Sequence, residues 1–284
     1  MLYERKRGNL TIKADTSGAE LHSIQLNGLE YLWQCGDAWK RYAPILFPFI
    51  CSPENNRYYA DGKEYHMKAN HGFARDLEFE TLEITEDSIS FVLQSNPETL
   101  AQYPYQFRLI VRYRILDNGV EVLHTIENSD NRPMYFYIGG HPSFNCPLEP
   151  EKGECFTDYY IEYNCEESAK NNNQEMVLDH EKILNLNRAL FDYDSIVMPD
   201  PASDEITLKS RKSEHAVTVK FPESKCMTIW SPTGDDRAQF VCLEPWTSVP
   251  TYFDDATPDL EQKAHAIRLD PGCVYKYCYQ IFVR

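Results

Sequence analysis

Three segments of the chain place an ionisable side chain among apolar residues, glycine and proline. His71 lies in NHGFARD (residues 70–76), His141 follows two glycines in YIGGHPSF (residues 137–144), and Glu244 ends an apolar run in FVCLEPW (residues 240–246). Glycine lets a ligand approach the backbone closely, and proline stiffens the residue before it. Burial raises the pKa of a carboxyl, and an imidazole titrates at about 6.5, so these groups suit acid–base chemistry near neutral pH.

Each segment also has a purely structural interpretation. A single histidine in a β protein is commonly a hydrogen-bonded structural residue, and His124, which alternates with apolar residues, is expected to be one. Glu244 is the stronger candidate, because a carboxylate is almost never fully buried without a partner. A zinc site of His71, His141 and Glu244 has suitable ligand types but lacks a short paired spacing, so no metal is predicted.

The elements that must position these side chains are strands. Alternation of apolar and polar residues is clearest in FRLIVRYRI, where the apolar positions are Phe107, Leu109, Val111, Tyr113 and Ile115. Asn118-Gly119 then predicts a type I′ hairpin turn, and the return strand has Val120, Val122, His124 and Ile126 on one face. Residues 79–94, 205–221 and 265–283 alternate similarly, the last with a turn at 270–272.

No window of helical length has a 3.6-residue apolar stripe, and no repeat or linker interrupts the chain. We predict an all-β protein, a large antiparallel β-sandwich in which residues 1–284 form a single domain. Short helical turns are expected near residues 97–103 and 186–193, and an exposed loop over 166–176. A site in such a fold needs a concave sheet face or a crevice between loops.

The composition excludes several classes of binding partner. The formal net charge of −16 argues against nucleic acid, anionic membranes and polyanionic substrates, and favours a neutral small molecule. The nine cysteines include no CxxC pair and several lie in predicted strands, which indicates reduced core thiols. No apolar segment follows the charged N-terminus, and APILFPFIC is too short for a membrane span, so a cytoplasmic location is expected.

The motifs HGFAR, GGHPSF and CLEPW, in that order, closely resemble those of the aldose 1-epimerases, or galactose mutarotases. The match is best to a bacterial branch often encoded beside lactose-operon genes. Flanking matches cover almost the whole chain, in EYLWQ, WKRYAPILFPFI, YYADGKEY, LFDYDSIV and TIWSP.

The resemblance implies a mutarotase-like sandwich with a monosaccharide lying across a concave sheet face and no cofactor. It also implies that Glu244 is the general base, that His141 is the general acid and that His71 binds near the ring oxygen. A carboxylate and an imidazolium suit this reaction, because the anomeric hydroxyl loses a proton while the ring oxygen gains one.

Further binding residues are expected around this pair. Trp246 offers a stacking face, more plausibly than Trp33 or Trp39 because it follows Glu244 by two residues. Arg75 is a candidate substrate ligand, although an ion pair with a neighbour such as Asp76 is the favoured interpretation.

The sequence departs from the family at one point. Relatives usually carry Gly-Arg after the segment matching PILFPFI, and that arginine contacts the sugar, whereas Cys51-Ser52 stand here. Arg57 is the candidate to reach the same space. The role of Asp194, in LFDYDSIV, is not assigned.

Two other functions remain open. A hexose-6-phosphate epimerase would need several converging basic residues, and Arg41, Arg57 and Arg75 show no clustering in the sequence. A non-catalytic sugar-binding protein of the same fold is the other alternative, motivated by Ser52. Neither the sugar nor the oligomeric state can be read from the sequence.

Overall fold

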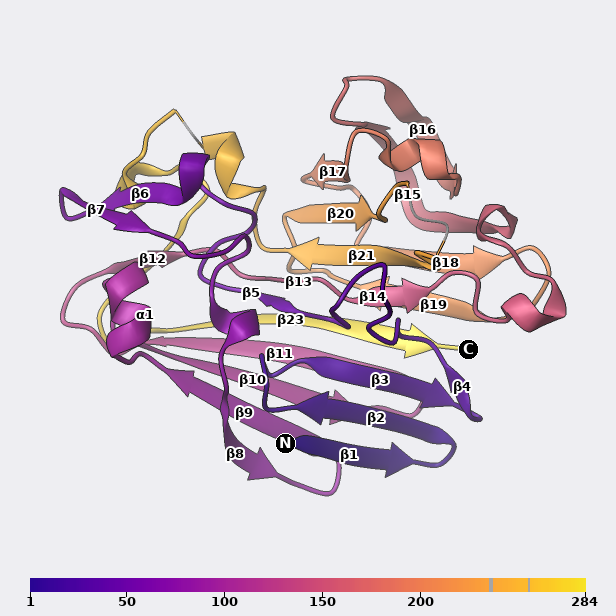
Figure 1. Ribbon diagram of the computed structural model, residues 1–284, viewed down its shortest axis with the longest axis horizontal. Coiled ribbons are helices and arrows are strands. Elements are labelled where there is room, and N and C mark those ends of the chain that lie inside the picture. Colours follow the sequence, from indigo (N-terminus) through magenta and orange to yellow (C-terminus); the bar gives the residue numbers. More distant parts are fainter. Residues whose placement is uncertain (235–236, 255) are drawn as a thin grey trace.

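Antiparallel strands dominate the computed structural model, which describes residues 1–234, 237–254 and 256–284 (Figure 1). The largest sheet has nine strands. In spatial order these are β16 (Met176–Asn185), β15 (Tyr159–Lys170), β18 (Glu205–Ser210), β19 (Ala216–Lys220), β23 (Val274–Val283), β11 (Gly119–Asn128), β10 (Phe107–Ile115), β9 (Ser88–Gln94) and β8 (Glu80–Ile84). The all-β prediction is confirmed.

Smaller sheets complete the fold. A six-stranded sheet contains β17 (Ile196–Pro199), β20 (Cys226–Trp230), β21 (Phe240–Trp246), β13 (Gly139–Gly140) and β5 (Ile45–Leu46), with β14 (Ser143–Asn145) also paired to β21. A four-stranded sheet contains β1 (Leu2–Arg7), β2 (Leu10–Asp15), β3 (Leu21–Leu26) and β4 (Leu29–Glu30). Two further pairs are β6 (Arg57–Ala60) with β7 (Lys63–His66), and β12 (Met134–Phe136) with β22 (Ile267–Leu269).

Helical segments are short. The α-helix is α1 (Pro97–Gln102), and its Asn96 side chain accepts hydrogen bonds from the amides of Glu98 and Thr99. The 3₁₀ turns are η1 (Glu54–Asn56), η2 (Ala74–Asp76), η3 (Pro150–Lys152), η4 (Phe156–Asp158), η5 (Arg188–Phe191), η6 (Thr251–Asp254) and η7 (Leu260–Gln262). The helical turns expected near residues 97–103 and 186–193 are therefore present. No helix of the described residues is long and apolar enough to cross a membrane.

The alternating pattern buries the faces that it predicts. All five apolar positions of β10 are buried, and so are Val120, Val122, His124 and Ile126 of β11. The smaller sheets cover this buried face: Phe47, next to β5, packs edge-on against Phe107 of β10, and Tyr113 donates a hydrogen bond to the Ala19 carbonyl. One cluster of buried apolar residues extends from Leu10 to Val283.

Two local predictions were wrong. Neither Asn118 nor Gly119 has the positive φ of a type I′ turn; Gly119 instead pairs with Phe282 of β23, where an added Cβ would lie 2.2 Å from the Ile281 carbonyl oxygen. Residues 166–176 are mostly not a loop, because β15 and β16 extend into them and leave a turn at 171–175. The Asn171 carboxamide closes that turn by accepting from the Asn173 and Glu175 amides.

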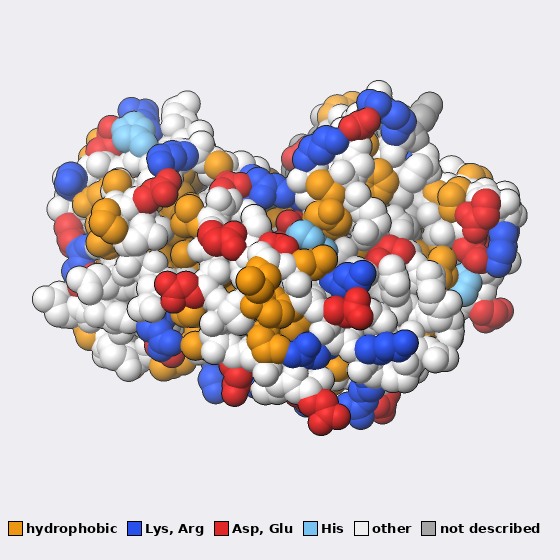
Figure 2. Space-filling view, turned by 60° about the horizontal axis from the view of Figure 1, so that its bottom comes forward, with side chains coloured by type: hydrophobic (Ala, Val, Ile, Leu, Met, Phe, Trp, Pro, Cys, Tyr) orange, Lys and Arg blue, Asp and Glu red, His pale blue; other side chains and the backbone are white. Residues whose placement is uncertain are grey.

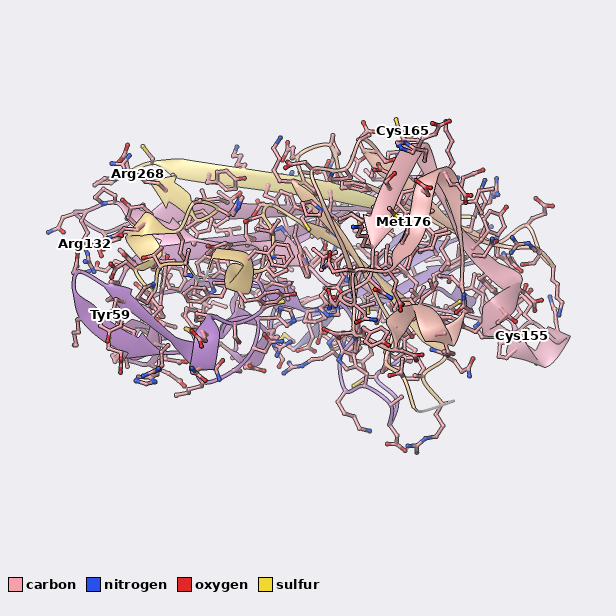
Figure 3. The ribbon with its side chains drawn as sticks, turned by 90° about the horizontal axis from the view of Figure 1, so that it is seen from above. Tyr59, Arg132, Cys155, Cys165, Met176 and Arg268 are labelled. Carbon is pink, nitrogen blue, oxygen red and sulfur yellow. The ribbon has the colours of Figure 1, made fainter. Side chains whose placement is uncertain are left out.

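All nine cysteines are free, as expected, but they are not all core residues: Cys155 and Cys273 are exposed. The surface mixes acidic and basic side chains and is notched between two lobes (Figure 2). From above, the β6–β7 hairpin with Tyr59 lies at one end of the molecule, and β15 and β16, with Cys165 and Met176, lie towards the other (Figure 3).

Candidate active site

A hollow of about 250 Å³ brings together residues from many parts of the chain. The three ionisable residues singled out from the sequence, His71, His141 and Glu244, all line it. The remaining lining residues are Trp39, Cys51, Asn70, Arg75, Asp194, Ser195, Thr228, Trp230 and Trp246. A hollow of this size, walled by aromatic and polar groups, is typical of a small-molecule site.

His141 and Glu244 form a close, buried pair. Glu244 lies in β21 opposite Thr228 of β20, and His141 follows β13, with its amide bonded to the Pro44 carbonyl at 3.0 Å. His141 Nε2 lies 3.2 Å from Glu244 Oε2, and the two side chains are 7% and 2% exposed. The Oε2 atom has no hydrogen-bond partner in the described part of the chain, so the pair is close without a formed hydrogen bond.

The glycines before His141 make room for protein side chains. A Cβ on Gly139 would lie 2.5 Å from Trp246 Cδ1, and one on Gly140 would lie 2.4 Å from Tyr279 Oη. The close approach that these glycines allow is therefore to the side chains of Trp246 and Tyr279, whereas the sequence had suggested a ligand. Gly139 thus packs against β21, its partner in the six-stranded sheet, and Gly140 packs against β23 of the nine-stranded sheet.

The backbone around His71 fixes which of its ring nitrogens carries the proton. His71 has φ +63° and exchanges two hydrogen bonds with Cys51, from the His71 amide to the Cys51 carbonyl at 3.0 Å and from the Cys51 amide to His71 Nδ1 at 2.9 Å. Because Nδ1 accepts this bond, a neutral His71 carries its proton on Nε2. His71 is thus a hydrogen-bond donor on the wall of the hollow.

Burial favours the uncharged forms of all three ionisable groups. It raises the pKa of Glu244 well above its ordinary range, and the charge of Asp194 adds to this effect while Arg75 opposes it. It lowers the pKa of His141 to about 3, with Arg75 contributing, and lowers the pKa of His71 well below 6.5. The pair therefore favours a carboxylic acid beside a neutral imidazole, in contrast to the carboxylate and imidazolium expected from the sequence.

The two arginine candidates lie in different places. Arg75 lines the hollow, and its buried Nε has no hydrogen-bond partner among the described residues. The ion pair expected between Arg75 and Asp76 is not formed, because Asp76 pairs with Arg41. Arg57 does not line the hollow; it lies on β6, 3.8 Å from the Glu64 carboxylate, and its position does not support a role as sugar ligand.

Two tryptophans wall the hollow more directly than Trp246 does. Trp39 stacks on His141 with ring centroids 5.0 Å apart, and Trp230 meets the same imidazole edge-on at 5.8 Å. Trp246 also lines the hollow but is 2% exposed and lies against Gly139. Trp230 was missed as a site residue although TIWSP had been matched, and its indole N–H donates to Asp194 Oδ1 at 3.0 Å.

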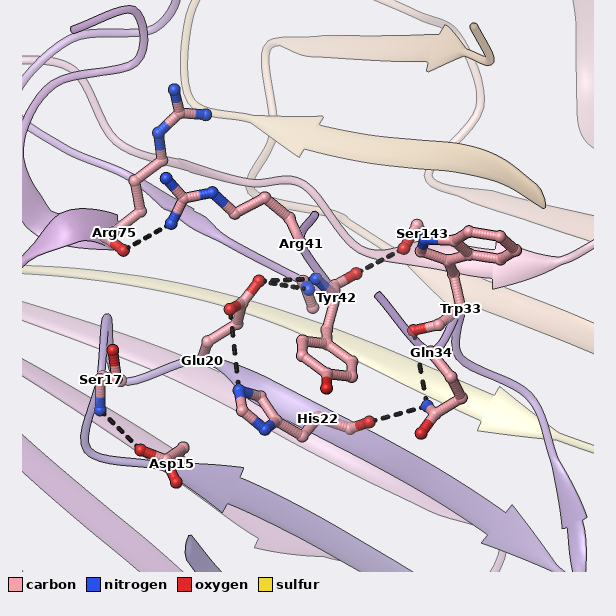
Figure 4. A network of polar contacts seen from close by, with 12 residues as sticks. Asp15, Ser17, Glu20, His22, Trp33, Gln34, Arg41, Tyr42, Arg75 and Ser143 are labelled. Carbon is pink, nitrogen blue, oxygen red and sulfur yellow. Dashed lines mark hydrogen bonds and ion pairs between the residues drawn. The ribbon is translucent and has the colours of Figure 1, made fainter. Parts of the chain in front are cut away.

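A network of polar contacts links Glu20, Tyr42 and Ser143, near His141 in the chain (Figure 4). The buried Glu20 carboxylate accepts hydrogen bonds from the amides of Tyr42 and Ala43 at 2.8 and 2.9 Å. The Tyr42 carbonyl in turn accepts from the Ser143 amide and hydroxyl, beside His141. Arg41 donates to the Arg75 carbonyl at 2.9 Å, so the same segment also fixes the 75–76 turn.

Comparison with known proteins yields one family. The family model described as aldose 1-epimerase matches residues 1–281. The plasmid-encoded LacX protein of Lactococcus lactis subsp. lactis is 32% identical, over the whole of this chain and 99% of the relative. Similar solved structures include a galactose mutarotase related enzyme from Lactobacillus acidophilus (TM-score 0.90, 28% identity, 100% of this chain and 97% of the other) and a galactose mutarotase-like protein from Lactobacillus casei (TM-score 0.88, 27% identity, 100% of both chains).

Proposed function

Because the chain belongs to the aldose 1-epimerase family, we propose that it interconverts the α and β anomers of a neutral hexose such as galactose or glucose. The single observation that carries the proposal is the buried pair of His141 Nε2 and Glu244 Oε2, 3.2 Å apart in a hollow of small-molecule size. No cofactor takes part in the proposed reaction.

The chemistry requires an acid and a base that lie close together. The anomeric hydroxyl and the ring oxygen of a pyranose are bonded to the same carbon, so the groups that serve them must also be neighbours. Glu244 takes the proton of the anomeric hydroxyl, the C1–O5 bond breaks with its electrons passing to O5, and His141 protonates O5. The open aldehyde turns about its C1–C2 bond, and the same transfers in reverse close the ring on the other face.

The electrostatics of the site favour the opened state. The reaction starts from the carboxylate of Glu244 and the imidazolium of His141, the ion-pair form that burial disfavours, and ring opening leaves a proton on Glu244 and a neutral imidazole. Burial favours the uncharged pair, so charge separation is relieved as the ring opens. The pair carries one proton in both states, so ring opening needs no net gain or loss of a proton by these two residues.

The other lining residues are proposed to bind the sugar. His71 donates through Nε2, Arg75 offers an unpaired Nε, and Asp194 offers carboxylate oxygen beside the indole of Trp230. Trp39 and Trp230 provide apolar faces against which the C–H groups of a pyranose pack. Trp246 remains a proposed contact from its place in the wall.

The place of Arg75 in the wall of the hollow is the one observation that favours a hexose-6-phosphate instead. Against this, Asp194 and Glu244 line the same hollow, and the formal net charge of the chain is −16. A dianionic substrate would meet these carboxyl groups at close range. Comparison of α-glucose with its 6-phosphate separates the two, and faster turnover of the phosphate would replace the neutral-sugar proposal.

The decisive experiment is polarimetry of freshly dissolved α-galactose and α-glucose with wild type, Glu244→Gln and His141→Asn. Loss of the base or the acid is expected to lower the catalysed rate by at least ~10²-fold, on the scale of general acid–base catalysis. The exposed, distant Glu64→Gln serves as the matched control and should keep the wild-type rate. A wild-type rate equal to the spontaneous one would leave a non-catalytic sugar-binding protein, and near-normal rates in either site variant would remove that residue from its role.

A further inference from the structure

A buried thiol completes a group of three metal-ligating side chains at the acid–base pair. Cys242 precedes Glu244 by two residues on β21, so both side chains project from the same face of the strand. One ligand atom each of His141, Cys242 and Glu244 lies within 4.8 Å of the others, and all three residues are buried. His71, the third ligand considered from the sequence, is not part of this group.

We propose that His141, Cys242 and Glu244 form a binding site for a thiophilic divalent cation such as Zn²⁺, which occupies and blocks the acid–base pair. The imidazole, thiolate and carboxylate are all common zinc ligands, with bonds of about 2.0–2.3 Å. Metal binding as such does not depend on the proposed mutarotase activity, whereas inhibition does.

The charges of the site suit a divalent ion. A thiolate and a carboxylate together carry two negative charges, so a bound Zn²⁺ gives a neutral centre. A neutral centre costs less free energy to bury than a charged one. The imidazole adds a third, uncharged ligand to these two anionic ones. Coordination would also use Glu244 Oε2, which has no hydrogen-bond partner among the described residues.

The geometry needs only a small adjustment. Bonds of this length place two ligands of a tetrahedral ion roughly 3.3–3.6 Å apart. His141 and Glu244 already meet at 3.2 Å, so the thiol would move inwards by at most roughly 1.5 Å, within reach of a side-chain rotation. His141 and Glu244 line the hollow, whereas Cys242 does not, so an ion would enter from the side of the imidazole and the carboxyl.

The alternative is that Cys242 only fills space in the core. It belongs to a small apolar cluster with Ala238 and Phe240, against which Trp39 and Trp230 pack. Packing alone predicts that serine at this position has no effect on metal affinity. The cation site predicts a large effect of this substitution on zinc affinity.

The test is zinc binding by the full chain, measured by competition with a chromogenic chelator, for wild type, Cys242→Ser and Cys51→Ser. Cys51 is the matched control, because it is another free thiol on the same hollow but is not part of the group. We expect one site that Cys242→Ser weakens at least about tenfold, as perturbed metal sites typically are, and that Cys51→Ser leaves intact. Mg²⁺ and Ca²⁺, which prefer oxygen ligands, should not compete.

Cobalt gives a second readout that is independent of affinity. Bound Co²⁺ should show thiolate-to-metal charge-transfer absorption in wild type and in Cys51→Ser, and lose it in Cys242→Ser. Equal zinc affinity in all three proteins, or loss in Cys51→Ser instead, would overturn the proposal. If the protein binds zinc through Cys242 but has no mutarotase activity, the metal site is supported and the proposed function is rejected. If the protein is an active mutarotase but does not bind zinc through Cys242, the proposed function is supported and the metal site is rejected.

Discussion

Replacing Gly72 by alanine tests whether the backbone next to His71 is held by close contact with a neighbouring segment. Gly72 has φ +73° and forms a parallel bridge with Phe47. A Cβ there would lie 2.2 Å from the Phe47 carbonyl oxygen and 2.6 Å from Pro48 N. Both are backbone atoms, so neither can rotate away as the end of a side chain could.

Two costs add at this position. A non-glycine residue in the left-handed region costs about 1–2 kcal/mol. Forcing extra volume into a packed site costs about 1–3 kcal/mol more. We therefore expect Gly72→Ala to lower the free energy of unfolding by about 2–5 kcal/mol, a large share of the roughly 5–15 kcal/mol typical of a folded protein.

Gly62→Ala is the matched control. Gly62 has nearly the same dihedral angle, φ +70°, but nothing lies within 4 Å of its added Cβ. Only the backbone cost of about 1–2 kcal/mol should then appear. Urea unfolding of the two variants and of wild type isolates the packing contribution as the difference between them, and equal losses in both variants would refute the packing explanation.

The same substitution should also disturb the site. The Phe47 carbonyl accepts hydrogen bonds from the amides of Phe73 and Ala74, directly after Gly72. Moving this segment away displaces His71 on one side and Arg75 on the other, so Gly72→Ala protein that still folds should bind sugar more weakly, with a raised KM in the mutarotation assay. Gly62→Ala should keep the wild-type KM.

Two further predictions concern residues outside the hollow. Glu20→Ala should lower kcat roughly ten- to hundredfold, because it loosens the 42–43 segment that supports His141. Glu20→Gln keeps an acceptor oxygen and should retain most of the activity, with little change in KM. Equal kcat values in the two variants would contradict this positioning role. His124→Phe should flatten the pH dependence of stability. Burial lowers the pKa of His124 to about 3, so below about pH 6.5 the unfolded chain binds a proton that the folded protein does not, and stability falls by about 1.4 kcal/mol per pH unit. Urea unfolding of wild type and His124→Phe at pH 6 and pH 5 measures this slope, and equal slopes in the two proteins would contradict the prediction.

The parts of the fold that could be predicted are those encoded by near neighbours in the chain. The alternation of apolar and polar residues over 107–115 requires only a sheet with one solvent-exposed face, and it identified the buried side of β10 correctly. His71, His141 and Glu244 were found because each breaks an apolar context locally, and the structure brings all three to one hollow.

The parts that could not be predicted depend on segments distant in sequence. Gly119 was interpreted as a turn residue because Asn-Gly has a strong local preference for turns. Its small size is instead needed against Phe282 of β23, 163 residues later in the chain. Asp76 pairs with Arg41, which lies 35 residues earlier in the chain, and not with its neighbour Arg75. No local sequence pattern indicates this pairing. Cys242 was expected to be a core thiol, and only the fold shows that His141, 101 residues earlier in the chain, lies beside it and Glu244.

Backbone strain links these distant contacts to the site. Three non-glycine residues of the hollow, Cys51, His71 and Asp194, have φ of +57°, +63° and +81°. Left-handed conformations cost free energy at each, and such strain persists only where surrounding contacts hold it. The paired hydrogen bonds between Cys51 and His71 and the bond from Trp230 to Asp194 are contacts of this kind. Removing the hydrogen bond between Trp230 and Asp194 should therefore release strain in the Asp194 backbone and disorder the site. The mutarotation rate is then expected to fall more than the free energy of unfolding.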